Sequence, residues 1–460
     1  MRCEIRNENV NGEPSAETFA FSFRTAHVVL LVALCGGCPA APSATTTSET
    51  RPSQRAQEPA PRVDRRAPTA LERGVFDRLA RVAEAVRGLT FESPVPIEIH
   101  TERAIAEHLD AELSDDDLAK AARVYGALGL LPPDLDLRAL LREVMSEQVV
   151  GYYDLEAHHL VVRDEIARGL VRDLGPSAAK TVIVHELVHG LQDQRLGFGE
   201  LSLREHDSDV DNVIKSLSEG DATLAMLVYQ AREMQVEVAD LLEHESFDNL
   251  RDLRVPASPD ALGRSPAILR YTLIVPYVAG LQWVRALSRD GADWTSVNDA
   301  YRTLPVSMEQ VLHPRRHQRG EEPDALALPT FESFDAWELI EEDTLGELEL
   351  GVFLARGSSG LDDYDRAAAE GWSGDRLRVY ARGDATCAIW VTVWDDAREA
   401  REAERAARRD ETQKVEREGR AVLILRNVPD ELQTEPRAAF QALAAALPEA
   451  PPRSVSTAEP

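Results

Sequence analysis

The chain has 460 residues, enough for one large domain or for two or three ordinary ones. Hydrophobic residues make up 43% and charged residues 28%, a balance that supports a packed core over most of the chain. Acidic residues outnumber basic ones by 80 to 51, giving a formal net charge of −29. This excess argues against nucleic acid or an anionic membrane surface as the main partner, because both require a basic surface.

Cysteine usage argues against a disulfide scaffold. Three of the four cysteines lie in the first 38 residues, and the fourth is Cys387. The expected mature chain therefore leaves Cys387 without a partner for an internal disulfide.

The N-terminus is typical of an export signal. Ala26 to Leu34 form a short apolar run, which Arg24 precedes and the letters "CGGC" follow. The run is too short to span a bilayer but fits the core of a signal peptide. Small residues before Cys38 resemble a bacterial lipoprotein cleavage site, with Cys38 acylated. The alternative is a metal or redox pair of Cys35 and Cys38, which the lack of a surrounding βαβ pattern disfavours.

We therefore expect residues 1–38 to be a lipoprotein signal. Residues 39–70 are rich in Pro, Ser, Thr, Ala and Arg, which predicts a disordered tether, and residues 451–460 predict a disordered tail. The expected location is the cell envelope, with the protein lipid-anchored or else periplasmic or extracellular. The apolar stretch from Thr272 to Val284 is too short for a membrane span and predicts a buried helix, so membrane attachment would come only through the N-terminal lipid.

The first elements of the folded part follow the tether. Apolar spacing predicts a helix over 71–87, and "PVPIEIH" at Pro94–His100 predicts a strand. Two or three helices follow, broken by Gly129 and by Pro132–Pro133. Residues 147–165 predict a β-hairpin around an Asp-Leu-Glu-Ala turn.

The later elements divide into a mainly helical group and a group of alternating strands and helices. We predict a helix opened by Pro176, a helix over 207–232, helices within 260–313, strands at 376–382, 387–394 and 420–428, and helices at 395–410 and 436–447. The predicted fold class is α+β, with a mainly helical part over 71–330 and a small α+β unit over 331–450. The second unit is either separate or integrated with the first.

The stretch "KTVIVHELVHGLQD" contains an H-E-x-x-H motif. On a helix, His185 and His189 share one face, as two zinc ligands require, and Glu186 projects beside them, where it would act as a general base. The apolar stripe of this helix is Val184, Leu187, Val188 and Leu191. The alternative is an amphipathic helix with a chance match, but the uncharged flanks suit a buried metal helix better.

A catalytic zinc ion needs a third protein ligand. The H-x-x-G-x-x-H continuation of metzincins is absent, because Gln192 and Arg195 occupy its last two positions. The downstream candidates are Glu205, His206, Asp207, Asp209, Asp211, Glu219 and Asp221. We favour Glu219, since Gly220 would let a facing backbone approach closely.

A helical wheel leaves alternatives open. Glu219 lies nearly opposite the apolar stripe of its helix, near Lys215, where an ordinary solvated glutamate would also lie. Asp221 lies on the stripe and therefore needs a partner; a hydrogen bond that orients a ligand histidine would supply one. Asp193, one turn past His189, is a candidate for the same orienting role. Capping or salt bridging would explain Asp221 and Asp193 equally well.

Several segments resemble a group of uncharacterised bacterial envelope proteins identified as H-E-x-x-H zinc metallopeptidases of gluzincin type. They are "VVGYYD", "HELVHGLQDQ", "SEGDATLAM", "PYVAGLQWV", "SMEQVLHP" and "AEGWSGDRLRVY", and the resemblance covers Val149 to Tyr380. "SEGDATLAM" is similar to the "E-G-x-A" segment in which a gluzincin glutamate completes the zinc site. Glu219 follows His189 by 30 residues, a longer separation than in the best-known gluzincins.

The resemblance implies a zincin-like core, a Zn²⁺ cofactor and hydrolysis of peptide bonds in a peptide or protein substrate. The expected zinc ligands are His185, His189 and Glu219. Glu186 would take a proton from water and pass it to the leaving amine. His313 is the first candidate for stabilising the oxyanion, with Tyr229 and Tyr277 next, and the hairpin offers an edge strand to an extended substrate. The alternatives are a zinc hydrolase acting on a non-peptide bond and an envelope protein that binds a partner and cleaves nothing.

Overall fold

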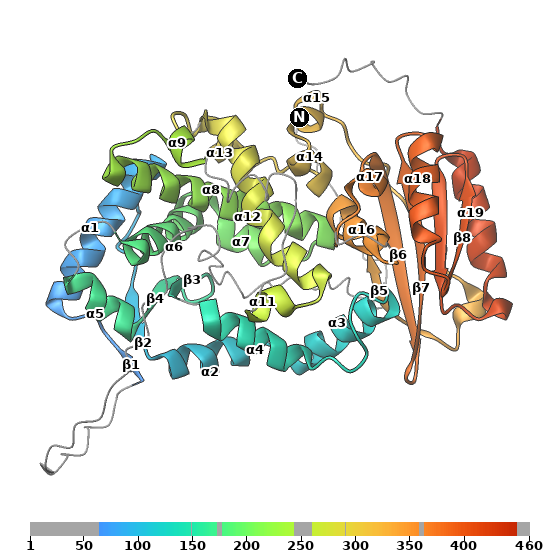
Figure 1. Ribbon diagram of the computed structural model, residues 1–460, viewed down its shortest axis with the longest axis horizontal. Coiled ribbons are helices and arrows are strands. Elements are labelled where there is room, and N and C mark those ends of the chain that lie inside the picture. Colours follow the sequence, from blue (N-terminus) through green and yellow to red (C-terminus); the bar gives the residue numbers. More distant parts are fainter. Residues whose placement is uncertain are drawn as a thin grey trace, which may run out of the picture.

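The computed structural model describes residues 64–148, 150–172, 177–242, 260–289, 291–357 and 363–448. The predicted signal peptide with Cys38, residues 39–63 of the predicted tether, Pro176 and the predicted tail lie outside these residues. The tether prediction is wrong for residues 64–70, because Arg65–Arg66 form a strand that pairs with Ile99 and His100. The described part is an α+β structure with many helices and two small sheets (Figure 1).

The N-terminal part contains the smaller sheet and the long helices. Its elements are β1 (Arg65–Arg66), α1 (Ala70–Arg87), β2 (Ile97–His100), α2 (Glu102–Glu112), α3 (Asp115–Ala127), α4 (Leu137–Gln148), β3 (Gly151–Asp154), β4 (His159–Arg163), α5 (Asp164–Arg172), α6 (Ala178–Leu196), α7 (Phe198–Ser202), α8 (Ser208–Met234), α9 (Val238–Leu242), α11 (Ala261–Arg264), α12 (Ala267–Ser288), α13 (Thr295–Ala300), α14 (Met308–Leu312) and α15 (Pro314–Arg319).

The C-terminal part contains the larger sheet. Its elements are η2 (Glu332–Phe334), β5 (Glu338–Asp343), α16 (Gly346–Ala355), α17 (Arg366–Ala369), β6 (Trp372–Arg382), β7 (Ala385–Trp394), α18 (Ala397–Ala407), β8 (Gln413–Glu418), β9 (Ala421–Arg426), η3 (Asp430–Leu432) and α19 (Thr434–Ala446). The sequence does not predict β5, α16, α17 or β8.

The smaller sheet has the strand order β1-β2-β4-β3. Strands β3 and β4 form the predicted hairpin, which is confirmed. Its loop begins at Leu155, one residue later than the predicted turn, because Asp154 still pairs with His159. Strand β4 lies between β2 and β3, so β3 alone is the edge strand of this hairpin.

Helix α8 packs against both α6 and α12. The crossing with α12 brings the two backbones together, because a Cβ atom at Gly220 would overlap the backbone of Gly280, and one at Gly280 would overlap the carbonyl of Ser216. The predicted close approach at Gly220 is therefore confirmed, and α12 is the element that approaches. Glycine at both positions fixes where the two helices cross.

Helix α12 has 22 residues and is long and apolar enough to cross a membrane by length and composition. In its most apolar window, 78% is buried inside the protein, against neighbours that include α8 and α16. The predicted buried helix is therefore confirmed, and it is longer than Thr272–Val284.

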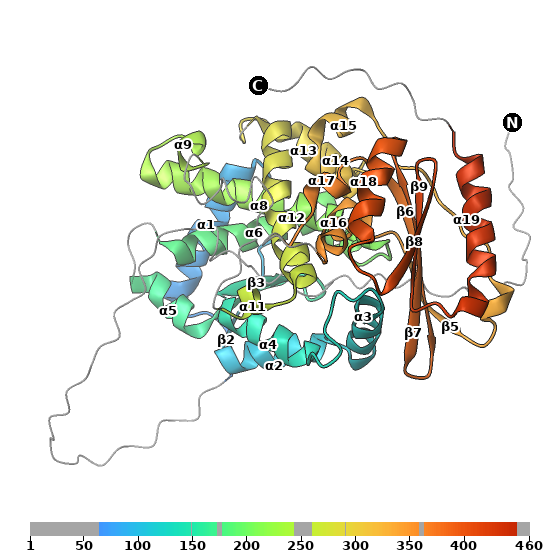
Figure 2. The same ribbon diagram turned by 45° about the vertical axis from the view of Figure 1, so that its right-hand side comes forward.

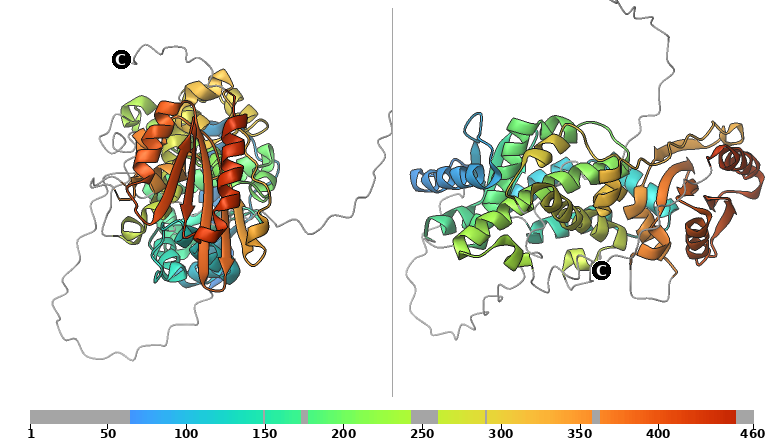
Figure 3. Two further views of the ribbon diagram at one scale, coloured as in Figure 1. Left: turned by 90° about the vertical axis from the view of Figure 1, so that its right-hand side faces the viewer. Right: turned by 90° about the horizontal axis from the view of Figure 1, so that it is seen from above.

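The larger sheet has the order β5-β6-β7-β9-β8 and is antiparallel throughout. Its side chains alternate between two apolar layers, as the two-residue period of a strand requires. Val391 and Leu423 pack with Phe440 of α19, whereas Trp390 and Ile424 face the main core with α16 and α18. Figures 2 and 3 show α18 and α19 on opposite sides of the sheet.

The main apolar core is continuous along the chain. One cluster of buried side chains extends from Val75 in α1 to Ile424 in β9. Helix α16 connects the two parts, because it packs against α8 and α12 as well as against β6 and α18. The core that holds α6 and α8 in place therefore continues past residue 331.

Candidate metal centre

Helix α6 carries the H-E-x-x-H motif. The hydroxyl of Ser177 caps its first turn by accepting a hydrogen bond from the amide of Lys180, and Gly197 ends it in a left-handed conformation. Every residue from Thr181 to Gln192 is buried, because α1, α8 and the β3–β4 hairpin enclose the helix. The predicted apolar stripe is buried, and the face that carries the two histidines is buried as well, as the uncharged flanks predicted.

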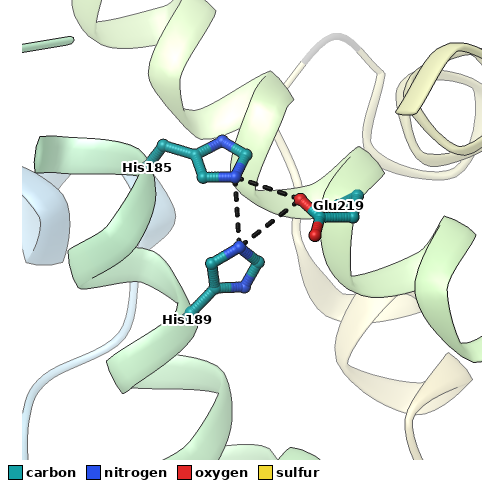
Figure 4. A group of neighbouring side chains, drawn as sticks. All are labelled: His185, His189 and Glu219. Carbon is teal, nitrogen blue, oxygen red and sulfur yellow. Dashed lines mark hydrogen bonds and ion pairs between the residues drawn. The ribbon is translucent and has the colours of Figure 1, made fainter. Parts of the chain in front are cut away.

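Three side chains on α6 and α8 meet in the interior. Nε2 of His185 lies 3.1 Å from Oε2 of Glu219 and 3.1 Å from Nε2 of His189. Nε2 of His189 lies 3.4 Å from the same Glu219 oxygen. Figure 4 shows the two rings and the carboxylate pointing toward one another across the gap between the helices.

The geometry of this cluster suits a small divalent metal ion. Bonds of about 2.0–2.2 Å in a tetrahedral site place ligand atoms roughly 3.3–3.6 Å apart, close to the 3.1–3.4 Å separations here. The exposed fractions of His185, His189 and Glu219 are 0%, 1% and 0%. A buried carboxylate needs a positive charge beside it, which a metal ion would provide. The residues therefore form a buried group that could bind a metal ion.

Without an ion, the positive charge in the cluster must be a proton. Burial lowers the pKa of His185 to about 4, so this ring is neutral at pH 7. Burial acts to lower the pKa of His189, but the charge and hydrogen bond of Glu219, together with Glu186 and Gln192, outweigh it and raise that pKa to about 9. A metal ion would take the place of this proton.

Gln192 orients one of the histidines. Nδ1 of His189 donates a hydrogen bond to Oε1 of Gln192 over 2.8 Å, and Nε2 of Gln192 donates to the carbonyl of Ser218 on α8 over 2.9 Å. With Nδ1 as the donor, Nε2 of His189 is left with its lone pair toward the cluster. The sequence prediction missed this role, although Gln192 lies three residues past His189 on the same side of α6.

Glu186 lies beside the cluster. Its Oε2 accepts a hydrogen bond of 2.9 Å from the backbone amide of Tyr153 in β3, and its Oε1 is buried with no hydrogen-bond partner among the described residues. Burial raises the pKa of Glu186 to about 8, while the nearby charges of His189 and Glu219 act in opposite directions. The edge strand β3 thus holds Oε2 of Glu186, while Oε1 has no hydrogen-bond partner among the described residues and is available to exchange a proton.

Asp193 and Asp221 do not orient the ligand histidines. Asp193 accepts hydrogen bonds from the Tyr153 hydroxyl, at 2.8 Å, and from Nδ1 of His158, at 2.7 Å, so it fastens α6 to the hairpin. Asp221 is buried and needs a partner, as predicted, but that partner is Arg87 at 2.5 Å.

The physical reason lies in the direction of each side chain. Asp193 faces the hairpin rather than α8. Asp221 faces α1 and α13, where the hydroxyl of Tyr301 also donates to it over 3.0 Å. The proposed orienting role of both aspartates is therefore wrong.

His313 also has a different partner. Its Nε2 lies 2.9 Å from Oε1 of Glu347, a buried residue of α16, and this pairing ties the end of α14 to α16. Of the two tyrosine candidates, Tyr277 is next to the cluster, because its ring stacks on His185 with 6.4 Å between centroids. Tyr229 is buried in α8, ten residues past Glu219.

The remaining candidates for the third ligand have other surroundings. Asp207 precedes the first turn of α8 and pairs with Arg376, and Asp209 accepts a hydrogen bond from the amide of Met308. Glu205 is exposed. Glu219 is therefore the carboxylate that the fold brings to His185 and His189, and its solvated alternative is excluded by its burial.

Comparison with known proteins adds information on the C-terminal part. A family model described as "Domain of unknown function (DUF8575)" matches residues 337–439. The match begins next to β5 and ends inside α19, so it covers the larger sheet and not the metal centre. No curated protein and no solved structure matches the chain.

Proposed function

We propose that this protein is a zinc-dependent metallopeptidase that hydrolyses peptide bonds. The observation that carries the proposal is the buried His185–His189–Glu219 cluster with the carboxylate of Glu186 beside it. Two imidazoles and one carboxylate are the protein ligands of a known class of catalytic zinc site that leaves a fourth position open. A glutamate next to the first histidine supplies the general base that such a site requires.

Zinc is the ion that best suits this ligand set. Imidazole nitrogens and a carboxylate oxygen are ligands of intermediate softness, and ligand atoms this close favour four-coordination over the six to eight oxygens that Ca²⁺ takes. When bound, Zn²⁺ would supply Lewis acidity toward a carbonyl oxygen and lower the pKa of water.

The residues of the chain would handle the protons. Oε1 of Glu186 would accept a proton from the attacking water and then donate it to the leaving amine. The amide of Tyr153 would keep Oε2 of Glu186 in place during this transfer, and Gln192 would hold the ring of His189. Tyr277 replaces His313 as the first candidate for a donor to the oxyanion, because its ring lies against His185.

The edge strand β3 suggests how a substrate would lie. An extended peptide can add to an edge strand through main-chain hydrogen bonds, and β3 is the edge next to Glu186. Strand β4, the other sequence candidate, lies inside the sheet and cannot serve this purpose. Together with the signal-like N-terminus, this favours a peptide or protein substrate in the cell envelope.

The burial of the cluster favours a second candidate function. Glu186, His185 and Glu219 each have an exposed fraction of 0%, so a peptide would reach them only after a neighbouring segment moved. An envelope protein that holds zinc for stability or for binding a partner would need no such movement. The two candidates differ in turnover and not in metal content.

The substitution Glu186→Gln distinguishes the peptidase from a zinc-binding protein without catalytic activity. The protein is incubated with a peptide library and the cleaved peptides are identified by mass spectrometry, while zinc is measured on the same samples. Replacing the base should lower the cleavage rate by at least about a hundredfold and leave zinc bound.

The matched control is Glu156→Gln, which neutralises an exposed glutamate in the hairpin loop and should leave cleavage unchanged. Cleavage that survives in Glu186→Gln would refute the proposed mechanism. A wild-type protein with zinc bound and no cleaved peptides would favour the second candidate.

A further inference from the structure

A second group of histidine and carboxylate side chains lies at the other end of the hairpin from its connection to α5. His108 and Glu112 are four residues apart on α2, so both project from the same face of that helix. Asp154 is the last residue of β3 and reaches the same place from the hairpin. The group therefore joins α2 to the edge strand.

Each of the three side chains offers one ligand atom, and these atoms all lie within 4.8 Å of one another. Nε2 of His108 lies 2.9 Å from Oε1 of Glu112 and 3.4 Å from Oδ2 of Asp154. The other oxygen of Asp154 accepts a hydrogen bond of 2.8 Å from the amide of Ala157, which fixes the carboxylate and leaves Oδ2 for the group. These separations resemble those in the His185–His189–Glu219 cluster.

Polar atoms around the group lack hydrogen bonds. Among the described residues, Nε2 of His108, Oε2 of Glu112 and the hydroxyl of Tyr152 are buried atoms with no aligned hydrogen-bond partner. Tyr152 is only 4% exposed, and its ring stacks on His108 with 5.7 Å between centroids. Burial first, and then the charges of Glu112 and Asp154, raise the pKa of the Tyr152 hydroxyl.

Protonation of His108 alone does not account for these atoms. A protonated ring would face both carboxylates through Nε2 alone, which lies 2.9 Å from Oε1 of Glu112 and 3.4 Å from Oδ2 of Asp154. The imidazolium balances part of the two negative charges. It still leaves Oε2 of Glu112 and the Tyr152 hydroxyl unpartnered, and such buried orphan groups are destabilising.

We propose that His108, Glu112 and Asp154 form a second binding site for a divalent transition-metal ion of the Zn²⁺ type. One imidazole and two carboxylates offer three ligand atoms, and the buried hydroxyl of Tyr152, whose ring stacks on His108, would hydrogen-bond a carboxylate or a water on the ion. The ion would fasten α2 to the end of β3. Tyr153 lies between Tyr152 and Asp154 in β3, and its amide holds Glu186. The ion would therefore stabilise the strand that positions the Glu186 carboxylate.

Zinc stoichiometry of the full chain tests this site. The wild-type protein should bind two equivalents of Zn²⁺ after dialysis, and Glu112→Gln should bind one. Glu107→Gln is the matched control, since Glu107 is a neighbouring α2 glutamate that pairs with Arg103 and should leave both equivalents in place. One equivalent in the wild type, or two in Glu112→Gln, would overturn the proposal.

Cobalt spectroscopy tests the same site without the central cluster. Co²⁺ added to Glu219→Ala should still give a visible d–d band from the second site, and this band should vanish in Glu219→Ala/His108→Asn. The band must lack a thiolate charge-transfer component, since the group contains no cysteine; a thiolate signal would overturn the assignment. This outcome is independent of peptide hydrolysis, because it is read from metal binding alone.

Discussion

Two clusters in this protein contain similar ligands in different surroundings. His185, His189 and Glu219 are wholly buried between two long helices, whereas the side chains of His108 and Glu112 are 26% and 21% exposed. The central cluster lies between α6 and α8, which pack against each other, and the glycine contact with α12 fixes the position of α8. The outer cluster joins one helix to the end of a hairpin.

The difference shows what determines the strength of a metal site with a given ligand set. Burial removes the competition of water for the carboxylate and strengthens its attraction to a cation. A rigid helix crossing also keeps the ligand atoms together before the ion arrives, so less conformational entropy is lost on binding. We therefore expect the central cluster to bind Zn²⁺ more tightly than the outer one.

Removal of Glu219 should have the largest effect on this comparison. Structural zinc sites contribute roughly 10–16 kcal/mol over four ligands, so one ligand is worth about 2.5–4 kcal/mol. Glu219→Ala should weaken zinc binding at the central cluster by two orders of magnitude or more. A competition titration against a chromophoric chelator measures this affinity. The substitution should leave the zinc affinity of the outer cluster unchanged.

Glu205→Ala is the control for that measurement. Glu205 was a candidate from the sequence and is exposed, so its removal should not change the affinity of the central cluster. If Glu219→Ala kept its zinc and Glu205→Ala lost it, the third ligand would be Glu205 and the conformation of the 203–207 segment would differ from the one described.

The crossing of α8 and α12 can be disrupted at Gly280. A methyl group there would overlap the carbonyl of Ser216, and because that atom belongs to the backbone of α8, the helices must separate. Gly280→Ala should lower the free energy of unfolding by about 2–3 kcal/mol and weaken zinc binding at the central cluster. Thermal unfolding followed by circular dichroism, with and without zinc, measures both effects.

Gly169→Ala is the matched control for the crossing. Gly169 lies on the exposed side of α5 with nothing within 4 Å of an added Cβ atom. The substitution should raise stability by roughly 0.5–1 kcal/mol, because alanine is the better helix former. Equal destabilisation by the two substitutions would show that the backbone contact at Gly280 is unimportant.

The sequence predicts the central cluster because the residues that mark it form short, local patterns. His185 and His189 are four residues apart on one helix, and Glu219 is marked by the glycine that follows it. The same local signal, a histidine and a glutamate four residues apart, was present at His108 and Glu112. That signal alone does not predict a metal site, because Asp154 joins His108 and Glu112 only through the tertiary fold.

Long-range partners and fully buried elements were the parts that the sequence did not predict. The partner of Asp221 is Arg87, 134 residues away, and no local pattern specifies that pairing. Helix α16 is buried on all sides, so it lacks the amphipathic period by which a helix is recognised. Strand β8 is short and polar at the sheet edge, which hides it from a hydrophobic pattern.

The role of Gln192 gives the smallest expected effect and the sharpest test of how the central cluster is held. Loss of a side chain that orients a ligand histidine typically weakens metal binding by about 10–100-fold, or roughly 1.4–2.7 kcal/mol. Gln192→Ala should fall in this range, and Gln194→Ala, which loses contacts with the backbone at Glu92 and Ser93, should match the wild type.

Gln192→Glu then separates the two hydrogen bonds of Gln192. A carboxylate can still accept from Nδ1 of His189 but cannot donate to the carbonyl of Ser218. Because carboxylates orient zinc-bound histidines well, this variant should bind zinc more tightly than Gln192→Ala. Equal loss in both variants would mean that the bond to Ser218, and thus the spacing of α6 and α8, matters more than the orientation of His189.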